Sequence, residues 1–276
     1  MKRALIVYAG IGMLLCAASW AGTAIDVKAP NLPEEVLAYM EVPSLSGLDK
    51  AIGEFAGGAG LDSPRRPMAV RLATQLAQAY PEATMRLDGA LRAFVFAPLD
   101  RTSIVGVIPV KDASGLIEAL KQRGMKPGPT QDGMSSLLRE RRQFDREAYQ
   151  KATAEEKRNF QQFMKTVEET YYVADLGDRA AVGQDSAQVA QVVALLKEKN
   201  IVDDALITGQ GHVAYFARPK TILTTPDNPI AKMRKMITQQ LAARPGQEAV
   251  AGILDAEFEL LEGLGKELES SAVAFW

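Results

Sequence analysis

Short apolar runs alternate with amphipathic stretches along this chain, and that alternation limits the folds it can adopt. The runs at 36–42, 90–98 and 103–110 are rich in β-branched and aromatic residues and are bounded by turn residues, which is typical of strands. The stretches 45–57 and 113–123 space their apolar residues at helical intervals. Strand, helix, strand, strand, helix opens a split β-α-β layout. We therefore predict an α+β fold with antiparallel sheets and helices packed on one face.

Further elements extend this pattern. A second helix is predicted from Pro67 to Tyr80, because proline is tolerated in the first turn of a helix. Residues 171–175 and 179–183 have the composition of a tight hairpin with a Leu-Gly-Asp turn between them, and 186–199 then has the apolar spacing of a helix.

Charged residues dominate between 139 and 170. Thr153 and Glu156 have the spacing of a capping box, and an apolar stripe follows at helical intervals from Phe160. We therefore predict a charged helical excursion over about 139–170 that packs through one narrow stripe.

Part of the sequence near the N-terminus recurs near the C-terminus. Residues 37–43 (LAYMEVP) match residues 213–219 (VAYFARP) at Ala, Tyr and Pro, and helical stretches and a short apolar run follow each; the last such run is Ala272 to Trp276. We predict two related α+β modules, a first over 25–206 and a partial second over 207–276. The second lacks a hairpin partner for its last strand, so we expect a fragment of a longer protein. The alternative is that this strand completes the first module's sheet.

The N-terminal segment 1–24 has the composition of a secretory signal peptide. Two basic residues precede an apolar run from Ala4 to Ala18, and small residues follow. Cleavage after Ala24 or after Ala21 would release an exported protein, periplasmic or extracellular. The alternative is an uncleaved segment that anchors the protein in the membrane.

Composition excludes several classes of function. The only cysteine, Cys16, lies in the apolar run after the large Leu15, so we expect neither lipidation nor, after cleavage, disulfides. Signal removal leaves 30 basic residues against 34 acidic, a net charge of −4, which is not the field of a nucleic-acid binder. The only histidine, His212, cannot form a multi-ligand zinc site without recruited carboxylates. We therefore predict no catalytic, cofactor-binding or metal-ligating residues and no cofactor.

Carboxylates near the predicted hairpin supply an alternative. Asp175, Asp178 and Asp185 could approach one another, as an acid–base pair or a calcium site requires. Tight turns also use Asp and Gly, and Asp185 stands at a natural helix N-cap. A carboxylate-dependent hydrolase or a calcium-binding protein using Asp175 and Asp178 is thus the alternative to turn and cap roles.

Other features each have two interpretations. A glycine cluster at 57–60 suits a helix end or a phosphate loop, and the amphipathic stretch 250–268 suits packing on its own sheet or partner binding. The pair Tyr171-Tyr172 suits a half-buried strand or a stacking platform. A basic cluster suits a solvated helix face or an anionic glycan or lipid headgroup, and its members are Arg139, Arg141, Arg142 and Arg146.

Several segments resemble a group of uncharacterised exported bacterial proteins. They are the Leu-Pro-Glu-Glu opening at 32–35, the stretch from Val107 to Asp112 and the segment from Tyr172 to Asp185. The resemblance covers about 31–220. It implies repeated α+β modules and no catalytic residues.

Together these features predict an exported, non-enzymatic scaffold or binding protein of the bacterial envelope. Its partner would be an envelope protein or ligand, with membrane contact only if the N-terminal segment is retained. The sequence leaves the partner and the oligomeric state open.

Overall fold

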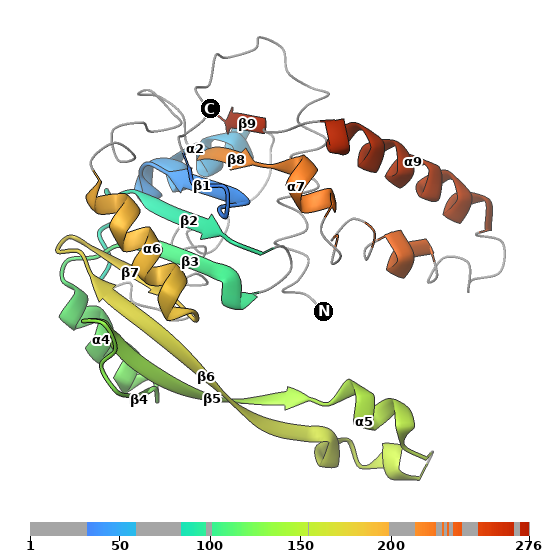
Figure 1. The fold of residues 1–276 in the computed structure, drawn as a ribbon, viewed down its shortest axis with the longest axis horizontal. Coiled ribbons are helices and arrows are strands. Elements are labelled where there is room, and N and C mark those ends of the chain that lie inside the picture. Colours follow the sequence, from blue (N-terminus) through green and yellow to red (C-terminus); the bar gives the residue numbers. More distant parts are fainter. Residues whose placement is uncertain are drawn as a thin grey trace.

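The computed structural model describes residues 32–58, 84–97, 101–153, 155–198, 213–224, 228, 231, 234–238, 248–267 and 271–275. Within them the strands form one nine-stranded antiparallel sheet in the order β4-β5-β6-β7-β3-β2-β1-β8-β9 (Figure 1). The predicted α+β class with antiparallel strands is confirmed. The strands are β1 (Ala38–Val42), β2 (Leu91–Val95), β3 (Ile104–Pro109), β4 (Lys126–Pro127), β5 (Ser135–Phe144), β6 (Met164–Asp175), β7 (Arg179–Gly183), β8 (Val213–Ala217) and β9 (Ser271–Phe275).

Aspartate side chains cap the N-termini of three helices, α4, α5 and α6. Asp112 caps α4 by accepting a hydrogen bond from Gly115 N, and Gly124 beyond its end has φ +88°. The helices predicted over 45–57, 113–123 and 186–199 are confirmed. The α-helices are α2 (Leu45–Gly58), α4 (Ala113–Gln122), α5 (Arg146–Lys151), α6 (Ser186–Lys197), α7 (Pro219–Thr224) and α9 (Glu248–Glu267); the 3-10 turns are η1 (Arg101–Ser103), η2 (Glu156–Arg158) and η3 (Phe160–Phe163).

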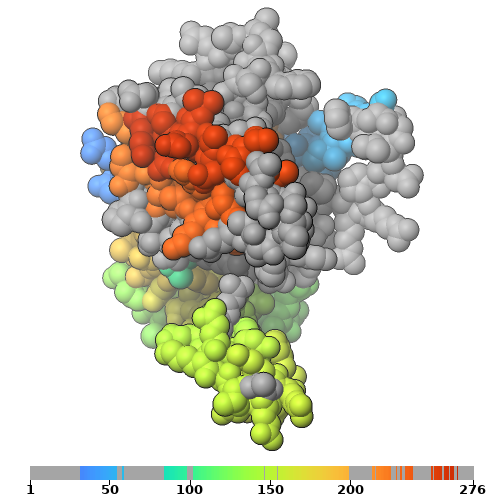
Figure 2. Space-filling view, turned by 90° about the vertical axis from the view of Figure 1, so that its right-hand side faces the viewer, coloured from blue at the N-terminus to red at the C-terminus, as the bar shows by residue number. Residues whose placement is uncertain are grey.

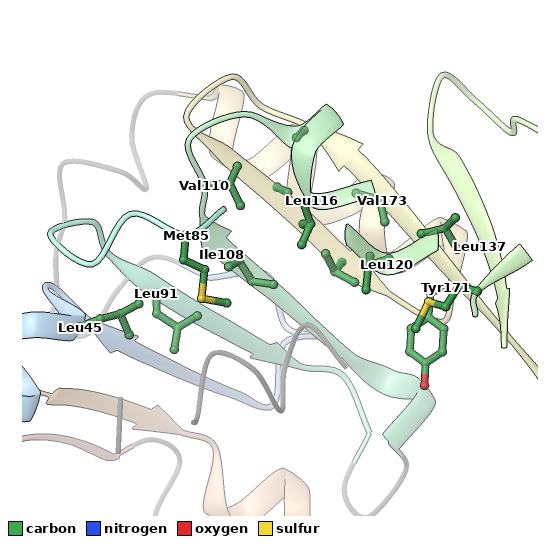
Figure 3. Packing of buried hydrophobic residues seen from close by; sticks show 14 of the residues in the cluster. Leu45, Met85, Leu91, Ile108, Val110, Leu116, Leu120, Leu137, Tyr171 and Val173 are labelled. Carbon is green, nitrogen blue, oxygen red and sulfur yellow. The ribbon is translucent and has the colours of Figure 1, made fainter. Parts of the chain in front are cut away.

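Each face of the sheet carries its own hydrophobic cluster. On one face Leu116 and Leu120 of α4 pack against Ile108 and Val173 (Figure 3). On the other, α6 packs its valines over strand residues whose side chains alternate with those of the first cluster, such as Val107. The expectation of helices on one face is therefore wrong. Both sides of the central strands are apolar, so each needs a cover.

The two predicted hairpins are confirmed. Strands β2 and β3 pair from Arg92↔Val107 to Val95↔Ile104, and β3 ends at Pro109, which lacks the N–H that a longer strand would need. Strands β6 and β7 turn at Gly177, whose φ of +81° suits glycine.

The strands of both predicted modules belong to one sheet. Residues Ala214 to Ala217 of β8 pair with Ala38 to Glu41 of β1, and β9 pairs with the other edge of β8. Residues 272–275 of the predicted apolar run thus belong to the same sheet as β1. The division into modules at 206/207 and the internal repeat stay predictions.

The predicted helical excursion over 139–170 is wrong for most of its length. Residues 139–144 continue β5 and residues 164–170 begin β6, while helical turns occur only between them. The capping box does form, since Thr153 N donates to Glu156 Oε2 at 2.6 Å, but it opens only the short turn η2.

Several predictions lie outside the described residues. They concern the signal segment 1–24 with Cys16 and both cleavage sites, the helix Pro67 to Tyr80, and His212. Among the helices that are described, none combines the length and apolarity needed to cross a membrane.

Candidate interaction site

The most prominent feature of the surface is a projecting β-ribbon, here called the arm, which spans residues 139–170. Strands β5 and β6 pair continuously from Ser135↔Val173 to Phe144↔Met164. Their outer neighbours stop early, because β4 reaches only Leu138 and β7 reaches back only to Tyr172. Beyond these points the ribbon has two strands among the described residues and stands away from the sheet (Figures 1 and 2).

Opposite charges line the arm. Arg139 faces Glu169 across the strands, and Arg141 Nε forms an ion pair with Glu169 Oε1 at 3.1 Å. On the other face, Lys126 Nζ donates to Glu140 Oε1 at 2.5 Å, and this hydrogen bond lowers the pKa of Glu140. Both faces are thus polar, and charged side chains on exposed strands discourage indiscriminate pairing with other strands.

Four aromatic rings form a small cluster at the tip of the arm. Phe144 stacks on Phe160 with 4.5 Å between ring centroids and 7° between planes. Tyr149 of α5 meets Phe163 edge-on at 5.1 Å, and Phe163 is the buried member. Such pairs contribute about 0.5–1.5 kcal/mol each beyond their buried area. The tip therefore has a core of its own.

Polar contacts fix the backbone around this cluster. Asp145 Oδ1 accepts a hydrogen bond from Ala148 N at 3.0 Å and so caps α5. Asp145 N donates to Phe163 O at 2.7 Å, which closes the tip on itself. The hydrogen bond from Ala148, followed by that from Lys165, lowers the pKa of the Asp145 carboxyl.

One ring of the cluster faces solvent. Phe160 is 52% exposed, although its inner side is stacked, and Lys157 and Arg158 precede it on the turn η2. A two-stranded ribbon is marginally stable alone in water, so the tip cluster and capping contacts are what order it. The arm can hold an exposed aromatic side chain in a fixed orientation at a distance from the sheet.

The structure gives structural roles to the three candidate carboxylates. Asp175 Oδ1 accepts from Gly177 N at 2.8 Å in the hairpin turn, and Asp178 Oδ2 pairs with Arg86 Nη1 at 3.1 Å. Asp185 caps α6 by accepting from Ala187 N and Gln188 N. Among the described residues no group of three or more His, Cys, Asp or Glu side chains could hold a metal ion.

The other sequence candidates occupy strand and helix positions. Arg139, Arg141 and Arg142 lie on β5, where the first two share one face and Arg142 points to the other, so the three do not form one basic helix face. Tyr171 is buried in one cluster, and Tyr172 packs against the other. The glycine pair at 57–58 ends α2, in agreement with a helix end.

A buried polar triad was missed by the sequence analysis. Tyr39 OH donates to Glu41 Oε2 at 2.9 Å, and Arg92 Nη2 donates to Glu41 Oε1 at 2.9 Å. The signal was present, because Glu41 and Arg92 are charged residues inside apolar strand runs. The triad joins β1 to β2 in the middle of the sheet.

Comparisons with known proteins supply no relative from which a function could be transferred. No protein family, curated protein or solved structure matches this chain.

Proposed function

We propose that this protein is an exported, non-enzymatic binding protein of the bacterial envelope and that it engages a partner protein through the tip of its arm. Export is supported by the n-, h- and c-region pattern of residues 1–24. The observation that carries the proposal is the arm, whose tip folds around its own aromatic cluster and leaves Phe160 exposed.

The arm contributes little to the stability of the fold, and its energetics fit a role in presenting its tip to a partner. Ordering each residue costs about 1–2 kcal/mol of backbone entropy, and the arm buries only the tip cluster in return. The arm is the outer part of β5 and β6, and it covers neither face of the sheet (Figure 1). An ordered projection that adds little to the core is explained by what it contacts outside the chain.

The tip also has the composition of a binding anchor. Aromatic residues dominate the buried centres of interfaces, because a rigid ring covers a large area at little entropic cost. Phe160 is such a ring, fixed by Phe144, with basic Lys157 and Arg158 close in sequence. The matching partner surface is an apolar pocket that accepts the ring of Phe160.

A photo-crosslinking amino acid at position 160, in cells that naturally make the protein, tests this function. We expect one dominant crosslinked partner protein, identified by mass spectrometry. The matched control places the same amino acid at Leu87, an exposed apolar position outside the arm. Position 160 yielding no product beyond that of position 87 would exclude the arm as a binding element.

A shortened arm provides the second test. Replacing residues 141–167 by Asn-Gly joins Glu140 to Glu168, which face each other across the ribbon, through a turn that suits a two-residue hairpin. The sheet should keep its cooperative melt, and the partner found at position 160 should no longer bind. Retained binding would contradict the proposal.

A further inference from the structure

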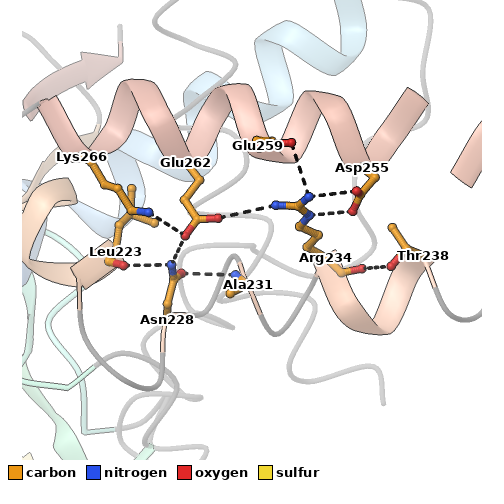
Figure 4. A network of polar contacts seen from close by, with 9 residues as sticks. All are labelled: Leu223, Asn228, Ala231, Arg234, Thr238, Asp255, Glu259, Glu262 and Lys266. Carbon is orange, nitrogen blue, oxygen red and sulfur yellow. Dashed lines mark hydrogen bonds and ion pairs between the residues drawn. The ribbon is translucent and has the colours of Figure 1, made fainter. Parts of the chain in front are cut away.

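The acidic side of helix α9 makes polar contacts with a distant part of the chain. Arg234 donates to both carboxylate oxygens of Asp255, with Nε···Oδ1 at 2.6 Å and Nη2···Oδ2 at 2.8 Å (Figure 4). Glu259 and Glu262 lie 3.6 and 4.0 Å from the same guanidinium. Positions 255, 259 and 262 recur at helical spacing, so one acidic face of α9 is directed at Arg234.

A second polar anchor lies one turn further along the same face. Asn228 Nδ2 donates to Glu262 Oε1 and to Leu223 O, both at 2.9 Å, and thereby links α9 to α7. Lys266 Nζ pairs with Glu262 Oε1 at 3.2 Å. Leu254 and Phe258 are half-buried beside these contacts.

Three aliphatic side chains among the described residues of α9 face solvent. Ile253 and Leu260, two turns apart on one face, are 62% and 64% exposed, and Val250 is 48% exposed. Small residues on the same side, Gly252, Ala256 and Gly263, are also exposed, and a Cβ at either glycine would meet nothing within 4 Å. Figure 2 shows α9 on the surface, on the same side of the molecule as the arm tip.

The exposure of these aliphatic side chains departs from the usual pattern of an amphipathic helix. A surface helix normally buries its apolar stripe and exposes its charges. Here Asp255 and Glu262 have polar partners elsewhere in the chain, while Ile253 and Leu260 face water. Clustered exposed apolar side chains are a mark of interaction sites.

The negative charge of α9 indicates which kind of partner can bind its exposed apolar face. The helix has six acidic residues and one basic residue, and Glu259 at the border of the apolar face is 76% exposed. A second copy of α9 or an anionic lipid surface would bring like charges together. A helix with its own apolar stripe and flanking Lys or Arg would match both the stripe and its acidic border.

We infer that the face of α9 defined by Val250, Gly252, Ile253, Ala256, Leu260 and Gly263 docks an apolar helix with basic flanks, contributed by a partner protein. The small residues let the two helix axes approach closely, and Ile253 and Leu260 supply the buried contacts. This surface is separate from the arm.

The test uses a fluorescein-labelled synthetic 18-residue helix with leucines at i, i+3, i+4 and i+7 and lysines beside them. A matched peptide carries glutamate in place of every lysine. We expect the lysine peptide to bind the full chain and the glutamate peptide to bind at least 10-fold more weakly, measured by fluorescence anisotropy.

Variants separate apolar docking from simple charge attraction. Ile253→Ser with Leu260→Ser should weaken the lysine peptide at least 10-fold, whereas Leu87→Ser, an exposed apolar site elsewhere, should not. Unchanged helicity by circular dichroism verifies that α9 persists, and the shortened-arm variant should bind the peptide like the parent chain. Equal binding by the double serine variant, no binding by the parent chain, or a dimer that this variant dissociates would each overturn the inference.

Discussion

Glu41 and Arg92 form an ion pair inside the sheet, with Glu41 Oε1 2.9 Å from Nη2 and 3.1 Å from Nε of Arg92. The two residues are only 3% and 6% exposed. Among the described contacts of Arg92, its Nη1 lacks a hydrogen-bond partner. A buried pair of this kind contributes little relative to apolar side chains, but either charge alone is costly.

Removing one partner should therefore destabilise more than removing both. We expect Glu41→Leu or Arg92→Met to lower the free energy of unfolding by about 3–5 kcal/mol. The double variant should recover most of that loss. Urea denaturation monitored by circular dichroism measures all three. Additive losses in the double variant would show that the pair itself is strongly stabilising.

The third member of the triad makes the protein sensitive to alkali. Burial, and then the charge of Glu41, raises the pKa of Tyr39 well above its ordinary value. Because the pKa is raised in the folded state, the stability linked to Tyr39 is complete below about pH 10 and is lost as pH rises further. The free energy of unfolding should fall more between pH 9 and 11 in the parent chain than in Tyr39→Phe. Parallel curves would contradict this.

Gly183 provides a test of how closely α6 packs on the sheet. A Cβ at this position would lie 2.8 Å from Val189 Cγ2 and 3.1 Å from Val105 Cγ2. Gly183→Ala should lower the free energy of unfolding by about 1–3 kcal/mol through overpacking. The control is Gly53→Ala in α2, where a Cβ meets nothing within 4 Å and alanine should stabilise by about 0.5–1 kcal/mol.

The free energy of unfolding and the response to calcium together distinguish structural roles of the candidate carboxylates from calcium binding. Asp185→Ala should cost about 1 kcal/mol, because it removes the N-cap of α6. Asp175→Asn should cost less, since an amide oxygen can still accept from Gly177 N. Calcium should leave the melting temperature of the parent chain unchanged. A rise that Asp175→Asn abolishes would instead support the calcium-binding alternative.

The tip of the arm should respond locally to mutation and to acid. Phe163→Ala should speed amide hydrogen exchange over 146–163 while the global melting temperature stays nearly constant, and Phe160→Ala should act in the same direction more weakly.

The lowered pKa of Asp145 means that its contribution to the stability of the tip is present above its ordinary pKa and is lost as pH falls through the folded-state value. Asp145→Asn should remove that acid dependence of exchange.

Local signals were sufficient for much of the sheet and its helices. The hairpin at β2 and β3 combines apolar runs with a polar turn, and α4 has both its cap at Asp112 and its apolar spacing. Each of these elements packs at least one face against a hydrophobic cluster. Its apolar residues therefore recur in the sequence with the period of a strand or a helix, which makes the element predictable.

The helical prediction for the arm was wrong for a physical reason. Both of its faces are polar, so β5 and β6 lack a two-residue apolar period beyond Leu138, while Phe160 and Phe163 fall at helical spacing. Those rings pack on Phe144 and Tyr149 within the tip, not along a helix stripe. Long-range strand pairing therefore overrode a real but short local helical preference.

For α9 the sequence predicted the helix but not which aliphatic side chains face solvent. Helical periodicity identifies an apolar side, and here Leu254 and Phe258 do lie inward. The exposure of Ile253 and Leu260 depends on Arg234 and Asn228, which lie far away in the sequence. Only the folded chain shows that these residues engage the acidic side of α9.

Strand β6 runs without a break from the tip of the arm into its pairing with β7. A load applied at Phe160 would therefore act on a lever whose fulcrum lies where β7 begins to pair, at Tyr172. Antiparallel strands pulled along their length resist in shear, whereas a sideways pull opens their hydrogen bonds one at a time. The direction from which a partner pulls on the arm thus determines whether the sheet transmits the force or yields to it.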